Sequence, residues 1–167
     1  ARFKFFLSNE LSISTDSIQT IVLGGHGDTM VPLLRFTSIS GIPLDEFIKK
    51  KRVNKEKVEQ IVSRTRNGGG EIVALMKNSS AFFSPATSAI EMLESYFFDN
   101  RRILPCSAYL EGEYSVNGLC VGVPIIIGKN GVEEIIELEL QNSEKDEFNN
   151  SVEAVKELVH KCKKLLV

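Results

Sequence analysis

The segment LCVGVPIIIGKNGVEEIIELEL, residues 119–140, decides the fold class of this chain. An Asn-Gly pair between two apolar runs is a strong signal for a β-hairpin, so strands are expected over 119–127 and 132–140. Beyond residue 135, isoleucine and leucine alternate with glutamate, which predicts a strand with one solvated face. Together with a further strand expected over 103–110, this segment predicts an antiparallel meander.

Helical and extended patterns surround this hairpin. The chain shows neither a regular strand–helix alternation nor the Gly-x-Gly-x-x-Gly turn of a dinucleotide-binding fold. We therefore expect an α+β domain, an antiparallel sheet meander flanked by helices. Further helices are expected over residues 2–11, 44–50, the stretch after Asn54, 85–98 and 143–166, and further strands over 18–23 and 31–38.

A histidine enclosed by glycines follows the strand expected at 18–23. The segment VLGGHGDTMVP covers residues 22–32. Glycine allows backbone conformations closed to other residues, and an imidazole titrates near neutral pH, so His26 is a candidate proton-transfer residue. A histidine that satisfies its hydrogen bonds in a glycine-rich turn explains the pattern equally well. The local sequence leaves both interpretations open.

Three consecutive glycines, Gly68 to Gly70, precede an apolar stretch. Their backbone amides could bind an anion, but the Lys-Ser/Thr pair of a P-loop does not follow them. A break between two helices that lets another backbone approach closely explains the glycines equally well, and we favour this break. A role in a pocket wall stays open.

Composition excludes several classes of protein. The formal net charge of -2 offers no general attraction to nucleic acid or to an anionic membrane, and no apolar run approaches the roughly 18 residues of a membrane helix. Cys106, Cys120 and Cys162 form no C-x-x-C pair, and with only His26 and His160 beside them no zinc-ligand spacing appears. We expect reduced thiols, no structural metal and a soluble cytoplasmic protein.

The first residues carry a helical stripe from Phe3 without a side chain that caps it. We therefore expect residues 1–167 to form a single domain of a longer chain, cut within a helix.

Six motifs follow one another along essentially the whole chain. They are Ala-Arg-Phe at 1–3, the strand and loop at 22–28, Val-Pro at 31–32, Arg-Asn-Gly-Gly-Gly-Glu-Ile-Val at 66–73, Ser-Pro-Ala-Thr-Ser-Ala-Ile at 84–90 and Gly-Val-Pro at 122–124. Together and in this order they resemble the malate/lactate dehydrogenase family, and the resemblance covers the carboxyl-terminal catalytic domain of that family. Gly25 beside the histidine and the Arg66 to Glu71 run look more like its malate dehydrogenases of the lactate-dehydrogenase-like group.

The resemblance implies roles for two side chains. His26 matches the family's catalytic histidine, a neutral imidazole that takes the hydroxyl proton of malate while hydride passes to NAD. Arg2 matches the arginine that holds the substrate's carboxylate, a task suited to a guanidinium because it forms two parallel charge-assisted hydrogen bonds. The aspartate that orients the family's histidine would fall just before residue 1, and Asp28 is not its counterpart.

The resemblance also implies a pocket segment, residues 78–81, in which Ser80 and Ala81 are the expected substrate contacts. The family often has glycine where Ser79 stands. Met30 is a further candidate for the pocket wall, with core packing as the alternative. We expect no cofactor-binding residue in this chain, because NAD is held mainly by an N-terminal nucleotide-binding domain that this sequence lacks.

The expected function is the catalytic-domain portion of an NAD-dependent malate dehydrogenase, which interconverts malate and oxaloacetate. Hydride transfer needs cofactor and substrate positioned together, so the isolated chain is expected to be inactive. Lactate dehydrogenase is the alternative within the enzyme class, and a noncatalytic domain for assembly or partner binding is the alternative outside it. Expected partners are the nucleotide-binding half and further copies in a homo-oligomer, but neither nucleic acid nor a membrane.

Overall fold

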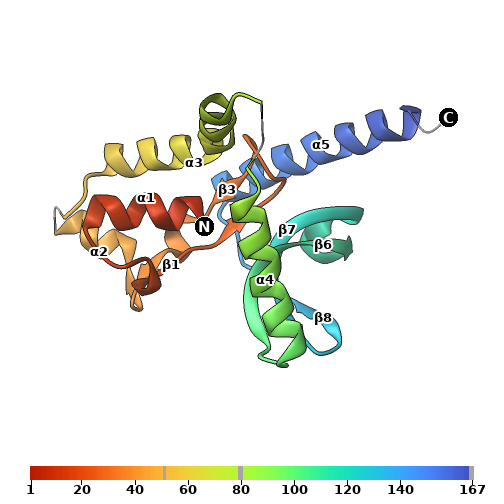
Figure 1. Ribbon diagram of the computed structural model, residues 1–167, viewed down its shortest axis with the longest axis horizontal. Coiled ribbons are helices and arrows are strands. Elements are labelled where there is room, and N and C mark those ends of the chain that lie inside the picture. Colours follow the sequence, from red (N-terminus) through yellow and green to blue (C-terminus); the bar gives the residue numbers. More distant parts are fainter. Residues whose placement is uncertain (51, 79–80, 166–167) are drawn as a thin grey trace. The chain divides into compact units, whose positions relative to one another are not determined.

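The computed structural model describes residues 1–50, 52–78 and 81–165 of the chain (Figure 1). Two compact units share these residues, and each buries its own set of apolar side chains. The first unit comprises Ala1–Ile21 and Pro32–Ser84, and the second comprises Val22–Val31 and Pro85–Val167.

The first unit is built by helices around one apolar cluster. Its described helices are α1 (Arg2–Leu11), α2 (Leu44–Lys49) and α3 (Lys55–Met76). Helices α1 and α3 lie side by side (Figure 1). Phe3, Leu7 and Leu11 of α1 and Val58 and Ile61 of α3 are buried in the shared cluster. These side chains recur every three or four residues, so one stripe of each helix faces the core, as the sequence predicts.

Helix α3 begins where the sequence predicts but is longer than expected. The Asn54 side chain accepts a hydrogen bond from the Lys57 amide at 2.7 Å, which caps the first turn. The helix then continues through Gly68, Gly69 and Gly70 to Met76. The predicted break at the three glycines is therefore wrong.

The strands predicted at 18–23 and 31–38 are both divided in the structure. After Pro32 the chain enters a 3-10 turn, beside which the Thr37 hydroxyl donates to the Leu33 carbonyl at 3.0 Å. Such local hydrogen bonds compete with strand pairing and end the extended stretch early. The short strands are β1 (Ile18–Gln19), β2 (Val22–Leu23), β3 (Val31–Pro32), β4 (Ser38–Ile39) and β5 (Ile42–Pro43), with β1, β4 and β5 in one sheet and β2 paired with β3.

The second unit contains the predicted antiparallel meander. Its strands are β6 (Arg102–Glu111), β7 (Asn117–Gly128) and β8 (Gly131–Ile135), in that spatial order. Strand β7 pairs with both neighbours, and Gly128 lies opposite Gly131 at the hairpin turn. Val121, Val123 and Ile125 alternate along β7 and are buried, as one face of a covered sheet requires.

Strand β8 ends earlier than the predicted boundary at Leu140. The Tyr114 hydroxyl donates to the Ile136 carbonyl at 2.7 Å and accepts from the Leu138 amide at 2.9 Å. Because a side chain occupies these backbone groups, they are not available to a neighbouring strand.

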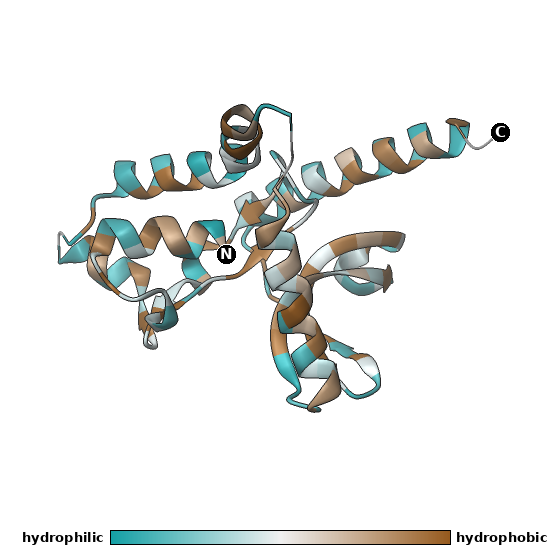
Figure 2. Ribbon diagram, viewed as in Figure 1, coloured by the Kyte–Doolittle hydropathy of each residue, from teal (hydrophilic) through white to brown (hydrophobic). Residues whose placement is uncertain are grey.

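Helices α4 (Phe83–Phe97) and α5 (Asn142–Leu165) complete the second unit. Helix α5 buries Phe148, Ser151 and Val152. Hydrophilic and hydrophobic residues alternate along the rest of the helix (Figure 2), where Leu158 and Leu165 are exposed. The antiparallel meander with its helices confirms the predicted α+β fold class. Within the described ranges, no helix combines the length and the apolar character that crossing a membrane would require.

Candidate active site

The loop that carries His26 starts at the end of β2, where it is fixed to the sheet. Gly24 has a φ of 88°, in the left-handed region that favours glycine. It exchanges two backbone hydrogen bonds with Gly122 of β7, each 2.9 Å long. A Cβ on Gly122 would lie 2.6 Å from the Gly24 carbonyl oxygen, so this close approach requires glycine at position 122.

A buried serine on α5 holds the same loop through its side chain. The Ser151 hydroxyl accepts a hydrogen bond from the Gly25 amide at 2.8 Å and donates to the Thr29 hydroxyl at 3.2 Å. Gly25 precedes His26 in the sequence and Thr29 follows it. One hydroxyl therefore connects both limbs of the loop.

His26 itself is exposed at the turn of the loop. Neither Asp28 nor any other side chain of the described residues forms a hydrogen bond or ion pair with its imidazole. An accessible imidazole on a fixed backbone can exchange a proton with a ligand, which is the chemistry of a general acid–base residue.

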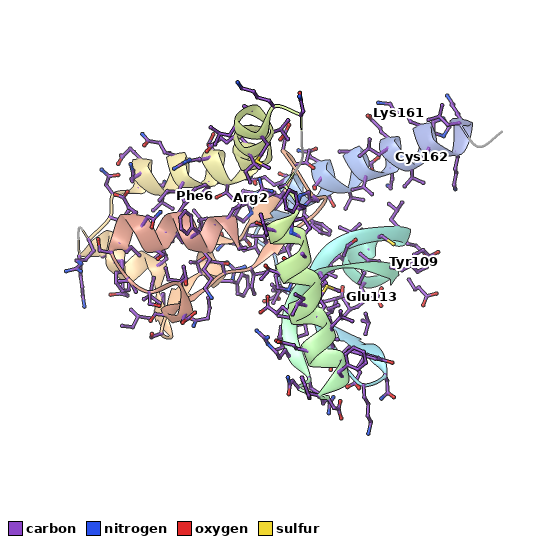
Figure 3. All side chains as sticks on the ribbon, in the orientation of Figure 1. Arg2, Phe6, Tyr109, Glu113, Lys161 and Cys162 are labelled. Atoms are coloured by element: carbon purple, nitrogen blue, oxygen red, sulfur yellow. The ribbon has the colours of Figure 1, made fainter. Side chains whose placement is uncertain are left out.

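Arg2 begins α1 in the first unit, and Figure 3 shows its side chain together with that of Phe6 on the same helix. Its Nη1 atom is buried and has no hydrogen-bond partner among the described residues. A buried guanidinium donor without an acceptor is costly, so a water molecule or a bound group can supply the partner that the described residues do not. A carboxylate is one group that can do so, because its two oxygens match the guanidinium fork.

The glycines of α3 make room for this arginine. A Cβ on Gly68 would lie 3.0 Å from the Arg2 Cδ and 3.2 Å from its Nη1, and a Cβ on Gly69 would lie 3.5 Å from Nη1. A Cβ on Gly70 would meet nothing within 4 Å. The predicted approach of another backbone at these glycines is therefore wrong, because the Arg2 side chain lies against them on a continuous helix.

An ion pair spans the same glycines on the surface of α3. Arg64 donates from Nε and Nη2 to the carboxylate of Glu71, at 3.0 to 3.2 Å. Its guanidinium also lies 4.3 Å from the centre of the Phe6 ring. The hydrogen bond from Arg64 keeps the pKa of Glu71 below its usual value, so the carboxylate stays charged and paired.

This chain is similar in sequence and structure to known proteins of one family. The family model for the lactate/malate dehydrogenase, alpha/beta C-terminal domain, matches residues 1–166. The chain belongs to the lactate/malate dehydrogenase family. This family consists of 2-hydroxyacid dehydrogenases, and the predicted resemblance is confirmed.

Solved structures of dehydrogenases are similar to this lactate/malate dehydrogenase domain throughout. Malate dehydrogenase from Cryptosporidium parvum is 43% identical with a TM-score of 0.96, over 98% of this chain and 52% of that chain. Lactate dehydrogenase from Eimeria maxima, solved with NADH and oxamate, is 43% identical with a TM-score of 0.94, over 98% and 51%. Malate dehydrogenase from Plasmodium falciparum in complex with NADH is 35% identical with a TM-score of 0.95, over 99% and 54%. The present chain spans about half the length of these structures.

Ser80, Ala81 and Met30 are the other residues predicted for the site. Ser80 lies outside the described residues, and Ala81 is half-buried just before α4. Met30 is 7% exposed, in keeping with the core-packing alternative. Among residues 1–50, 52–78 and 81–165, no group of three or more His, Cys, Asp or Glu side chains could hold a metal ion.

Ser151 is not among the residues predicted for the site from the sequence, although it stands beside apolar residues of the predicted helix. A hydroxyl on the buried face of a helix needs a hydrogen-bond partner. That requirement is a signal for Ser151, but the sequence gives no indication that the partner is the loop that carries His26.

Proposed function

We propose that this chain is the catalytic-domain portion of an NAD-dependent malate dehydrogenase, which interconverts malate and oxaloacetate. The observation that carries the proposal is the buried, unpartnered Nη1 of Arg2 beside the glycines of α3, in a chain of the lactate/malate dehydrogenase family. The substrates of such an enzyme are carboxylates, which supply the acceptor that this donor lacks.

In this proposal Arg2 binds and orients the substrate. Its guanidinium holds the carboxylate next to the reacting carbon through two hydrogen bonds, which fixes the direction of that carbon. Ser80 and Ala81 are proposed to contact the same substrate from the segment before α4.

In this proposal His26 moves the proton. During malate oxidation the neutral imidazole accepts the proton of the C2 hydroxyl, and the hydride leaves C2 for the cofactor. During oxaloacetate reduction the imidazolium returns that proton to the carbonyl oxygen. We propose that an aspartate from outside this sequence accepts a hydrogen bond from the second ring nitrogen and so stabilises the imidazolium.

We propose that this chain holds no complete cofactor site of its own. The pairs β1–β4, β4–β5, β6–β7 and β7–β8 are antiparallel, whereas a dinucleotide-binding fold has a mostly parallel sheet. The sequence also contains no Gly-x-Gly-x-x-Gly. We propose that a nucleotide-binding half holds NAD, which supplies or takes the hydride when bound. The isolated chain is then inactive.

Exposed apolar side chains support a proposal of further subunit contacts. Ile90, Leu93 and Phe97 of α4 are 50 to 73% exposed. Apolar residues gathered on one helix are typical of surfaces that another protein covers. We propose that the nucleotide-binding half and other copies of the chain cover such surfaces in a homo-oligomer.

Lactate dehydrogenase is the second candidate. The Eimeria maxima lactate dehydrogenase and the Cryptosporidium parvum malate dehydrogenase have the same identity to this chain, 43%. The malate proposal depends on the glycine beside His26 and on the Arg66 to Glu71 run.

Steady-state kinetics of a fusion enzyme test the proposal. In this fusion, the half of the Cryptosporidium parvum malate dehydrogenase that the chain does not match precedes residue 1. We expect NADH oxidation with oxaloacetate, a much lower rate with pyruvate, and no turnover by the 167-residue chain alone. A higher rate with pyruvate would favour lactate dehydrogenase. A second fusion, with the corresponding half of the Eimeria maxima lactate dehydrogenase, checks whether the borrowed half sets the substrate preference. A fusion that binds NADH but reduces neither compound would contradict the proposal.

Replacing Gly68 with alanine is expected to weaken substrate binding without destabilising the fold. The new Cβ displaces the Arg2 side chain, so the KM for oxaloacetate should rise about 10-fold in the fusion enzyme. Alanine is also a better helix former than glycine by about 1 kcal/mol, so the melting temperature should not fall.

Gly70→Ala is the matched control for this substitution, because it adds a methyl group in open space on the same helix. It should raise the melting temperature and leave KM unchanged. Equal KM values for the Gly68→Ala and Gly70→Ala enzymes would show that Gly68 makes no room for a functional arginine.

A further inference from the structure

The Ser151 hydroxyl on α5 makes two hydrogen bonds to the loop of residues 24–30 that carries His26, here called the histidine loop. We propose that Ser151 is a positioning residue for His26, so that removal of its hydroxyl slows catalysis through the loop. This inference depends on the proposed function, in which His26 is the base. Ser151 does not touch the substrate in this account and acts only through the backbone of the loop.

The two hydrogen bonds of Ser151 have the geometry for this role. Gly25, which donates to the hydroxyl at 2.8 Å, is adjacent to His26. Thr29, which accepts from it at 3.2 Å, lies on the returning limb of the loop. A hydroxyl that accepts from one limb and donates to the other fixes their separation, and this separation sets the place of the imidazole between them.

Packing leaves the loop little freedom to move toward α5. A Cβ on Gly24 would overlap the Ser151 hydroxyl and lie 2.9 Å from the Ser151 Cβ, and a Cβ on Gly25 would lie 2.9 Å from the Val155 Cγ2. The two glycines therefore seat the loop directly on the helix.

Core residues fix the helix that carries Ser151. Phe148 is 1% exposed, Val152 is 4% exposed, and Ser151 itself is fully buried. The Phe148 ring also lies against Tyr114, with 5.2 Å between the ring centres. The core of the second unit therefore fixes the position of the hydroxyl, and the two hydrogen bonds of the hydroxyl fix the loop relative to α5.

A purely structural role for Ser151 makes a different prediction, and Ser95 provides the comparison. Ser95 is equally buried, donates to the Ile127 carbonyl at 2.7 Å and accepts from the Arg102 amide at 3.1 Å. Ser95 lies in the same unit as Ser151, and its hydroxyl also makes two hydrogen bonds, but neither of them goes to the histidine loop. Ser95→Ala therefore measures the general cost of losing such a hydroxyl.

The test compares Ser151→Ala with Ser95→Ala in the fusion enzyme. Small displacements of a catalytic group lower turnover steeply, so we expect kcat to fall about 10-fold or more in the Ser151→Ala enzyme, with little change in KM. The Ser95→Ala enzyme should keep its kcat while its melting temperature falls to a similar extent. Exchange of the Gly25 amide, followed by NMR, should be faster in the Ser151→Ala enzyme only.

Substitutions at Thr29 give a second test that leaves the buried helix intact. Thr29→Val removes the acceptor at nearly constant shape and should lower kcat, whereas Thr29→Ser keeps a hydroxyl and should retain it. If the Ser151→Ala protein does not fold, the kcat values of Thr29→Val and Thr29→Ser test whether the hydrogen bond between Ser151 and Thr29 positions His26.

An unchanged kcat in the Ser151→Ala enzyme, or an equal loss in the Ser95→Ala enzyme, would overturn the inference while the proposed function stands. If Ser151→Ala does not fold, equal kcat values for Thr29→Val and Thr29→Ser would overturn it. A wild-type fusion without activity would instead overturn the proposed function, and the catalytic inference with it. The exchange rate of the Gly25 amide would then still show whether Ser151 fixes the loop.

Discussion

Replacing His26 with asparagine in the fusion enzyme is expected to lower kcat by about 100- to 10,000-fold, the usual contribution of a general acid–base group. Asparagine keeps a polar side chain of similar size but cannot take up a proton. The exposed position of His26 predicts that the fold tolerates the change, so the melting temperature should stay near that of the wild type. The measurement is the steady-state rate of NADH oxidation with oxaloacetate.

The second histidine of the chain is the control. His160 lies exposed on α5, and the sequence contains only these two histidines. His160→Asn should therefore leave kcat unchanged. A His26→Asn enzyme with at least a tenth of the wild-type kcat would show that His26 is not the base.

Replacing Arg2 with lysine should have the second large effect, on substrate binding. Lysine keeps the positive charge but loses the planar fork, so one carboxylate oxygen loses its charge-assisted partner. Breaking a buried pair of this kind costs about 3 kcal/mol, which corresponds to a fall of about 100-fold in kcat/KM for oxaloacetate. Most of this fall should appear as a higher KM.

Lys4 on the same helix provides the matched control for charge. Lys4→Gln removes a positive charge from α1 but leaves the Arg2 guanidinium and its glycines in place. Its kcat/KM should remain within about 2-fold of the wild type, because the half-buried Lys4 is not among the proposed substrate contacts. If Arg2→Lys has an equally small effect, the guanidinium does not anchor the substrate.

Features encoded by short stretches of sequence could be predicted. The Asn54 cap and the Gly128 to Gly131 turn each depend on a few adjacent residues, and both are present in the structure. The helical stripe of Phe3, Leu7 and Leu11 likewise predicts the bounds of α1. Local chemistry determines these elements, and tertiary contacts do not override it.

The continuity of α3 could not be predicted from the glycines alone. Glycine disfavours a helix by about 1 kcal/mol per residue, so three in succession predict a break. Arg2, from a different helix, packs on Gly68, and within α3 itself the ion pair of Arg64 with Glu71 spans the glycines. The helix thus continues through an unfavourable local sequence with one tertiary contact and one ion pair of its own beside the glycines.

In the candidate site, too, features that depend on adjacent residues could be predicted, and contacts between distant residues could not. The glycines around His26 mark the loop in the sequence, whereas its hydrogen bond to Ser151 joins residues 126 positions apart. A pattern of apolar residues shows which face of α5 is buried but not what that face contacts. The roles of His26 and Arg2 came from the family resemblance, since glycine next to histidine is equally compatible with an ordinary turn.

A crystal structure of the fusion enzyme with NADH and oxamate is the most direct test of whether Arg2 and His26 act on one substrate. We expect the oxamate carboxylate to accept two hydrogen bonds from the Arg2 guanidinium. Its carbonyl oxygen should lie within about 3 Å of an imidazole nitrogen of His26, the distance that proton transfer requires. Oxamate bound beside the nicotinamide but away from either side chain would contradict the proposed roles.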